Sequence, residues 1–159
     1  MAAVLQVRHD SGSSGLSDLM PEQATAGMSS RSVRVRAELA ALRDLRCTLA
    51  EALTREGWAG DAARRVLIAS TEAMANALEH GSAPGARIDV AFTVSEGAVS
   101  VRVLDEGRPG DQASLAEAGA PPVTSTHGRG RLLMRAMADE LQVRRLGGGT
   151  EVLLGFRAA

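Results

Sequence analysis

Two pairs of short segments with alternating apolar residues constrain the fold of this chain more than any other feature. The segments cover residues 88–94, 99–103, 141–146 and 150–156. A period of two is typical of strands that bury one face, and glycine-containing turns, at Gly97 and at Gly147–Gly149, join the members of each pair. The pattern therefore predicts two antiparallel hairpins, which leave one apolar face of a sheet to be covered.

The segment before the first hairpin predicts a further strand and a helix. Val33–Arg36 alternates apolar and basic residues, which indicates a short strand at a sheet edge. Glu38–Glu56 carries leucines at helical spacing and is followed by Gly57, which can end a helix in the left-handed conformation. These leucines are Leu39, Leu42, Leu45, Leu49 and Leu53. We expect this helix to pack on the domain's own sheet rather than on a partner.

Two more helices are expected later in the chain. One runs from Asp61, a plausible N-cap, to His80 and ends at Gly81. Its apolar stripe consists of Leu67, Met74 and Leu78. The other follows a pair of glycines and ends near Glu140. Together the elements predict an α/β fold, more closely a two-layer α+β sandwich in which a mixed, mostly antiparallel sheet is covered on one face by about three helices.

Length and composition indicate one domain. The chain has 159 residues, of which 45% are hydrophobic, enough for one well-formed core. Residues 1–30 are rich in Ser, Gly and Ala without periodicity, so we expect a disordered tail there and a domain over residues 31–159. A net charge of -1 indicates neither direct nucleic-acid binding nor an acidic membrane surface as a partner. No apolar run is long enough to span a membrane, and the lone Cys47 fits a cytoplasmic protein.

The basic residues exclude several classes of enzyme. All 18 are arginine, and the chain contains no lysine. A Walker-type phosphate loop, a Schiff-base enzyme and the protein-kinase fold each need a lysine. Any nucleotide must therefore be bound by other groups.

The second helix carries the first candidate site. Glu72 and Asn76 are four residues apart, so they lie on one helix face, with His80 a turn further on. An amide oxygen can bind a hard cation, and a nearby carboxylate can act as a base. A solvated polar stripe would show the same spacing, and this segment alone does not separate the two interpretations.

A second candidate lies where the second strand ends, at Asp105-Glu106-Gly107. A carboxylate there can accept a hydrogen bond from an exocyclic amine, and glycine lets the backbone approach a flat ring. A simple Asp-x-Gly turn at a strand end is the alternative.

The third candidate begins with an irregular loop, Asp111–Thr126, whose length suggests a lid or a binding loop. Gly128 and Gly130 then precede a helix and can expose backbone N–H groups to an anion. Arg129 and Arg131 add positive charge. Thr150 begins the last strand, where its hydroxyl either faces a site or merely favours strand geometry.

The order of these motifs over Val33–Phe156 resembles the Bergerat-type (GHKL) ATP-binding fold, the superfamily of gyrase, sensor histidine kinases and MutL. The small single domain and the run Asn-Ala-Leu-Glu-His-Gly at residues 76–81 look most like the bacterial anti-sigma-factor serine/threonine-protein kinases. The resemblance implies ATP and Mg²⁺ as cofactors.

The resemblance also implies a role for each matching residue. Glu72 would be the general base, and Asn76 would bind Mg²⁺. Asp105 would accept from the adenine amine, with Gly107 against the ring and Thr150 assisting through water. Residues 111–126 would form the ATP lid. The phosphates would be bound by Gly128, Gly130 and one or both of Arg129 and Arg131.

The implied function is that of an anti-sigma factor that sequesters a sigma factor and phosphorylates a STAS-type anti-sigma antagonist. Leu39–Leu53 and Val33–Arg36 would form a homodimer or partner surface, as in relatives. Pro109 replaces a usual glycine, and Thr126-His127 stands where relatives often carry an arginine. Two alternatives therefore stay open: a nucleotide-dependent partner-switching module without significant kinase activity, and a histidine-kinase catalytic domain, although no His-containing dimerisation helix precedes the domain.

Overall fold

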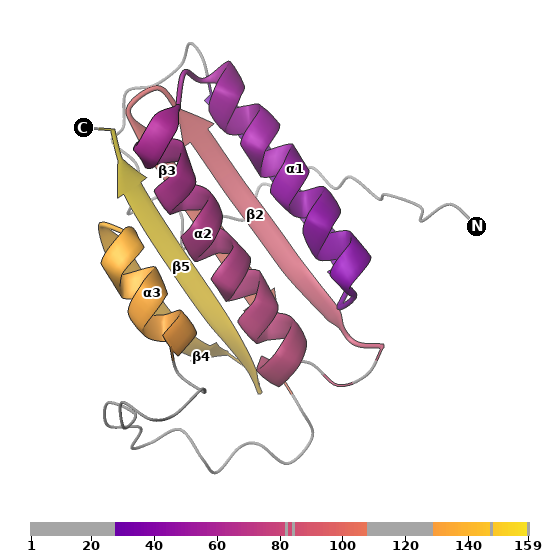
Figure 1. The fold of residues 1–159 in the computed structure, drawn as a ribbon. Coiled ribbons are helices and arrows are strands. Elements are labelled where there is room, and N and C mark those ends of the chain that lie inside the picture. The colour runs from indigo at the N-terminus through magenta and orange to yellow at the C-terminus, as the bar shows by residue number, and fades with distance from the viewer. Residues whose placement is uncertain (1–27, 82, 84, 108–128, 147, 159) are drawn as a thin grey trace.

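The computed structural model describes residues 28–81, 83, 85–107, 129–146 and 148–158. In this part of the chain, a five-stranded sheet carries three α-helices on one face (Figure 1). The other face of the sheet has no helix over it among the described residues. This arrangement confirms the predicted two-layer sandwich.

The sheet is antiparallel at every described pairing. Its strands are β1 (Met28–Arg36), β2 (Arg87–Ser95), β3 (Ala98–Asp105), β4 (Glu140–Leu146) and β5 (Gly149–Arg157). They are arranged in the order β1-β2-β3-β5-β4. Both predicted hairpins, β2–β3 and β4–β5, are confirmed. A mixed sheet would contain a parallel pair of strands, and none occurs among the described strands. β5, the second strand of its hairpin, lies next to β3 and runs antiparallel to it.

β1 is an edge strand, as predicted, but it is longer than Val33–Arg36. It starts at Met28 and pairs with β2 along its whole length, from Met28 opposite Ser95 to Arg36 opposite Arg87. Met28–Ser30 therefore belong to the sheet and not to a tail. Backbone pairing at an edge does not require apolar side chains, so periodicity gave no signal there. The rest of the predicted tail, residues 1–27, lies outside the described residues.

The helices lie side by side across the sheet. α1 (Leu39–Arg55) lies over β1 and β2, α2 (Gly60–Asn76) over β3 and β5, and α3 (Arg129–Met137) beside α2 towards β4 (Figure 1). α2 continues into a single π-helical turn, Ala77–Gly81. None of the described helices is long and apolar enough to cross a membrane.

The core between the layers follows the predicted pattern with two differences. Leu42, Leu45, Leu49 and Leu53 of α1 are buried, whereas Leu39, the first residue of the helix, is 77% exposed. Along α2, Met74 is buried, but Leu67 and Leu78 are only partly buried. The fully covered positions are mostly small, namely Val66, Ala69, Ser70, Ala73 and Ala77. Small side chains let α2 pack closely on the sheet.

Two predicted helix ends differ from the structure. The N-cap of α2 is Ala59 rather than Asp61, which lies in the first turn and pairs with Arg64 at 3.1 Å. α3 ends at Met137 rather than near Glu140. The N–H of Asp139 already donates to the carbonyl of Gly155 at 3.0 Å, so pairing with β5 ends the helix earlier.

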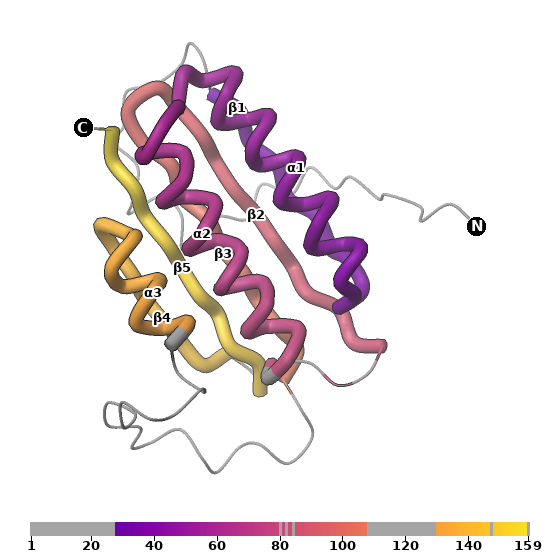
Figure 2. Tube along the Cα trace, in the orientation of Figure 1, coloured from indigo at the N-terminus to yellow at the C-terminus, as the bar shows by residue number. Residues whose placement is uncertain are grey.

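A tryptophan fixes the end of the sandwich where α1 passes into α2. Trp58 is 5% exposed, and its Nε1 donates to the carbonyl oxygen of Ser95 at 2.7 Å. The left-handed Gly57 before it confirms the predicted helix stop. At the opposite end of α2, the π-helical turn contacts β3 and β5, as the traced chain shows (Figure 2). The candidate site residues gather at that second end.

Candidate functional site

The first part of the site is a buried carboxylate at the end of β3. Asp105 is 6% exposed, and its Oδ1 accepts hydrogen bonds from the backbone N–H groups of Gly107 at 2.9 Å and Thr150 at 3.0 Å. The described residues provide no hydrogen-bond donor to its Oδ2. Thr150 thus contributes its backbone N–H to this part of the site. Whether its hydroxyl also assists a ligand stays a prediction.

Three glycines make this close packing possible. A Cβ on Gly81 would overlap the carboxylate of Asp105, and one on Gly149 would overlap the Asp105 carbonyl oxygen. Gly107 has φ +74°, and a Cβ there would overlap the carbonyl oxygen of Gly148. The sequence indicated Gly107 as part of the site, but gave Gly81 and Gly149 only the roles of a helix stop and a turn.

Burial controls the chemistry of Asp105. Desolvation raises the pKa of its carboxyl group, while the hydrogen bonds from Thr150 and Gly107 and the positive charge of Arg145 act in the opposite direction. A desolvated carboxylate with one oxygen already bonded leaves the other for a donor from outside the chain. Such a group selects a ligand that presents an N–H at this one point.

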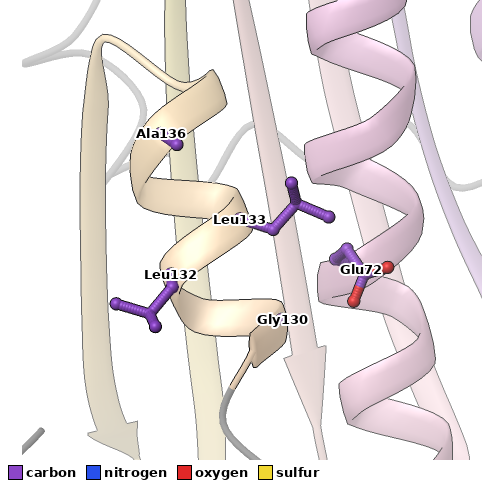
Figure 3. A pocket seen from close by; sticks show the side chains of 5 residues that line it. All are labelled: Glu72, Gly130, Leu132, Leu133 and Ala136. Carbon is purple, nitrogen blue, oxygen red and sulfur yellow. The ribbon is translucent and has the colours of Figure 1, made fainter. Parts of the chain in front are cut away.

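The second part of the site lies between α2 and α3. Glu72 and Asn76 are half-buried, and the structure confirms that they share one face of α2. A Cβ on Gly130 would lie 2.8 Å from Glu72 Oε2 and 3.1 Å from Asn76 Nδ2, so the first turn of α3 sits directly against both side chains. Figure 3 shows Glu72 pointing towards α3. A carboxylate, an amide and a helix N-terminus thus converge on one point.

A pocket extends from this point along α3. It has a volume of about 490 Å³, and the described residues that line it are Glu72, Gly130, Leu132, Leu133 and Ala136 (Figure 3). Apart from Glu72, this lining is apolar or glycine. The polar convergence point is therefore continuous with an apolar groove.

Other predicted site residues are placed less fully. Arg131 is exposed on the first turn of α3. Gly128, the loop 111–126 and the side chains of Arg129 and His80 lie outside the described residues. Whether they contact a ligand stays a prediction.

The donor set fits a metal that arrives with a nucleotide better than one bound by the protein alone. Within the described part of the chain, no three His, Cys, Asp or Glu side chains cluster in a way that could hold a metal. Asn76 offers one amide oxygen beside the N-terminus of α3. Mg²⁺ commonly takes only one or two protein ligands and completes its shell with phosphate oxygens and water.

Comparison with known proteins agrees with this fold. The model of a family described as the histidine kinase-like ATPase domain matches residues 35–156. A crystal structure of the RsbU and RsbW domains of Rv1364c from Mycobacterium tuberculosis has a similar fold, with a TM-score of 0.61 at 24% sequence identity. The match covers 81% of this chain but 32% of that one, so this chain spans about a third of that protein. No curated protein matches the chain.

Proposed function

Because the chain belongs to the histidine kinase-like ATPase domain family, which implies ATP binding, we propose that it is an ATP- and Mg²⁺-dependent protein-serine kinase. The observation that carries the proposal is the close approach of Gly130 to both Glu72 and Asn76. A carboxylate, an amide and a helix N-terminus meet there, and they could supply the base, the metal ligand and the phosphate donors that phosphoryl transfer requires of a protein.

The two parts of the site would divide the nucleotide between them. The free oxygen of Asp105 would accept the adenine amine, and Gly107 would let the ring approach the backbone. Asn76 would bind Mg²⁺, and the N–H groups at the start of α3 would face the phosphates. We place Gly128, Arg129, Arg131 and the lid 111–126 on the phosphate side as part of the same proposal.

Bound ATP supplies the phosphoryl group, and the chain's own residues position the acceptor. Glu72 is half-buried and reaches the convergence point from α2, so it can take the proton from an approaching serine hydroxyl. The groove along α3 leaves space for that acceptor. No covalent enzyme intermediate is needed, because positioning and charge neutralisation carry such a reaction.

The resemblance to anti-sigma-factor kinases and the likeness to a structure that contains an RsbW domain support a specific substrate class. We propose a STAS-type anti-sigma antagonist as the serine substrate, a sigma factor as the second partner, and the cytoplasm as the location. The exposed Leu39 and the edge strand β1 would contribute to a homodimer or partner surface. A constant monomeric mass across a concentration series in light scattering would contradict the homodimer.

The replaced arginine at Thr126-His127 favours a second candidate function. In it, nucleotide occupancy selects a partner without significant phosphotransfer. Radiolabelled phosphotransfer to purified STAS-domain proteins separates the two functions. Transfer to a serine supports the kinase, whereas ATP binding without transfer supports the switch.

The test of the site combines calorimetry with phosphotransfer. Glu72→Ala should leave the affinity for Mg²⁺-ATP nearly intact and abolish transfer, because the base contributes to the reaction rather than to binding. Asn76→Ala should weaken only the Mg²⁺-dependent part of binding. Equal transfer rates for Glu72→Ala and wild type would exclude Glu72 as the base.

A further inference from the structure

We infer that the groove along α3 binds an apolar side chain next to the acceptor serine of the protein substrate, and so selects acceptor segments by sequence. The inference rests on the proposed kinase function and adds a subsite to it. The groove would be the part of the enzyme that distinguishes one serine from another.

Glu72 lines the groove and also lies against Gly130 at the convergence point with Asn76. The phosphate side of Glu72 is defined by Gly130 and Asn76. On the other side, the groove that Glu72 lines continues along Leu132, Leu133 and Ala136 of α3 (Figure 3). An acceptor chain that lies in the groove therefore runs along α3.

The length of a hydrogen bond limits how far the acceptor serine can lie from Glu72. A serine hydroxyl must come within about 3 Å of Glu72 to lose its proton to it. Consecutive Cα atoms are about 3.8 Å apart, so the residues that flank this serine lie within reach of the groove. The side chains there are Leu133, which points towards α2, Leu132, which points away from α2, and Ala136 (Figure 3).

The chemistry of the lining decides which side chain fits. Apart from Glu72, the described lining offers no charge, and Leu132 is 57% exposed although it is large and apolar. Burying this surface under an apolar side chain is favourable, whereas an acidic one would lose hydration beside the carboxylate of Glu72. Beyond the groove, α3 carries Arg135 in its last turn and no acid, so carboxylates further from the serine are favoured.

Two synthetic serine peptides test the inference. Both carry glutamates at a distance from the serine, but the flanking residues are leucine in one peptide and aspartate in the other. Each is titrated into the full chain with Mg²⁺ and a non-hydrolysable ATP analogue, and the methyl NMR signals of Leu132, Leu133 and Ala136 are followed. The leucine peptide should shift these signals and bind about tenfold more tightly than the aspartate peptide.

Matched variants locate the binding. Leu132→Ala should weaken the leucine peptide about fivefold. Val143→Ala should leave it unchanged, because Val143 is 41% exposed on β4 and does not line the groove. A Val143→Ala loss as large as that of Leu132→Ala would overturn the assignment.

The remaining outcomes are distinct. Equal binding of both peptides, or no methyl shift in a chain that binds the ATP analogue, would overturn the groove inference alone. If the methyl signals shift with protein concentration in the absence of peptide, the groove binds a second copy of the chain. This result would also overturn the groove inference. A wild-type chain that does not bind the analogue would remove the proposed function and the inference with it.

Discussion

The two ends of the candidate site are built in opposite ways. At the Asp105 end, three glycines and two backbone hydrogen bonds surround a carboxylate that is 6% exposed. At the Glu72 end, two half-buried side chains face a single glycine and an open apolar groove. The first end is held by packed backbone, whereas the second is formed by half-buried side chains.

This difference indicates which part of recognition is pre-formed. A ligand group that meets Asp105 finds its partner already oriented and desolvated, so little ordering is needed on binding. At Glu72, by contrast, the phosphates and the acceptor must complete the arrangement. We therefore expect substitutions at the Asp105 end to affect stability and binding together, and substitutions at the Glu72 end to change binding or the reaction with little effect on stability.

The largest effect is expected at Gly107. Gly107→Ala should lower the free energy of unfolding by about 3 kcal/mol, because alanine at φ +74° is strained and its Cβ overlaps the carbonyl of Gly148. Urea unfolding measures this. Gly57→Ala is the matched control: its φ is +81° but no atom lies within 4 Å of the added Cβ, so about 1 kcal/mol is expected. Equal costs at the two positions would show that the Asp105 end is not tightly packed.

Asp105→Asn should lower the affinity for ATP about a hundredfold, since a charged hydrogen-bond acceptor is lost. Calorimetry measures this affinity, and the pH dependence of the affinity adds a second check.

Because burial raises the pKa of Asp105 in the folded chain, the carboxylate of Asp105 takes up a proton at a higher pH in the folded state than in the unfolded state. The contribution of Asp105 to the free energy of unfolding should therefore rise as the pH falls through the raised pKa, while the affinity for ATP should fall.

Comparison of wild type with Asp105→Asn isolates this residue from the titration of the nucleotide itself. The difference in ATP affinity between the two proteins should become smaller as the pH falls. A difference in affinity that is constant from neutral pH down to the unfolded value of 3.8 would contradict the assignment of Asp105 as the acceptor.

Gly130→Ala should lower ATP affinity and phosphotransfer about tenfold while changing the free energy of unfolding by less than about 1 kcal/mol. The added Cβ meets the ends of two flexible side chains, Glu72 and Asn76, rather than backbone. Better helix propensity of alanine offsets part of the crowding. A loss of stability as large as that of Gly107→Ala would mean that both ends are equally rigid.

The smallest effect is expected at Arg145. Arg145→Gln removes a positive charge that lowers the pKa of Asp105, so the pH at which ATP affinity falls should move upwards. Arg144→Gln is the control, because adjacent strand residues point to opposite faces of the sheet and only Arg145 shares a face with its partner Thr150. Calorimetry at several pH values compares the two, and an equal shift in both would point to a general change in charge.

Local sequence patterns predicted most of the scaffold. Alternation identified both hairpins, and spacing identified the shared face of Glu72 and Asn76, because both features repeat within a few residues. The Asp-x-Gly turn after β3 was likewise visible, since Gly107 needs its positive φ locally. Features that lie within one element or one turn could therefore be predicted from the sequence.

Features that depend on contacts between distant segments could not be predicted from the sequence. Gly81 matters because the end of α2 packs on Asp105, a residue 24 positions further along the chain. Thr150 contributes a backbone N–H, which every residue except proline possesses, so its identity gave no signal. The start of β1 at Met28 depends on pairing with β2 and not on its own side chains. Each of these is set by tertiary packing rather than by propensity.

Trp58 has a practical consequence for all of these measurements. It is the single tryptophan of a chain without tyrosine, so its indole gives nearly all of the ultraviolet fluorescence. It lies just before Gly60, the first residue of α2, whereas Asn76 is the last residue of that helix. The 16 residues from Gly60 to Asn76 span about 24 Å at 1.5 Å per residue. Its emission should therefore follow global unfolding, when the hydrogen bond to Ser95 breaks, and stay constant on nucleotide binding. The molecule carries its own optical reporter of folding, spatially separated from the site.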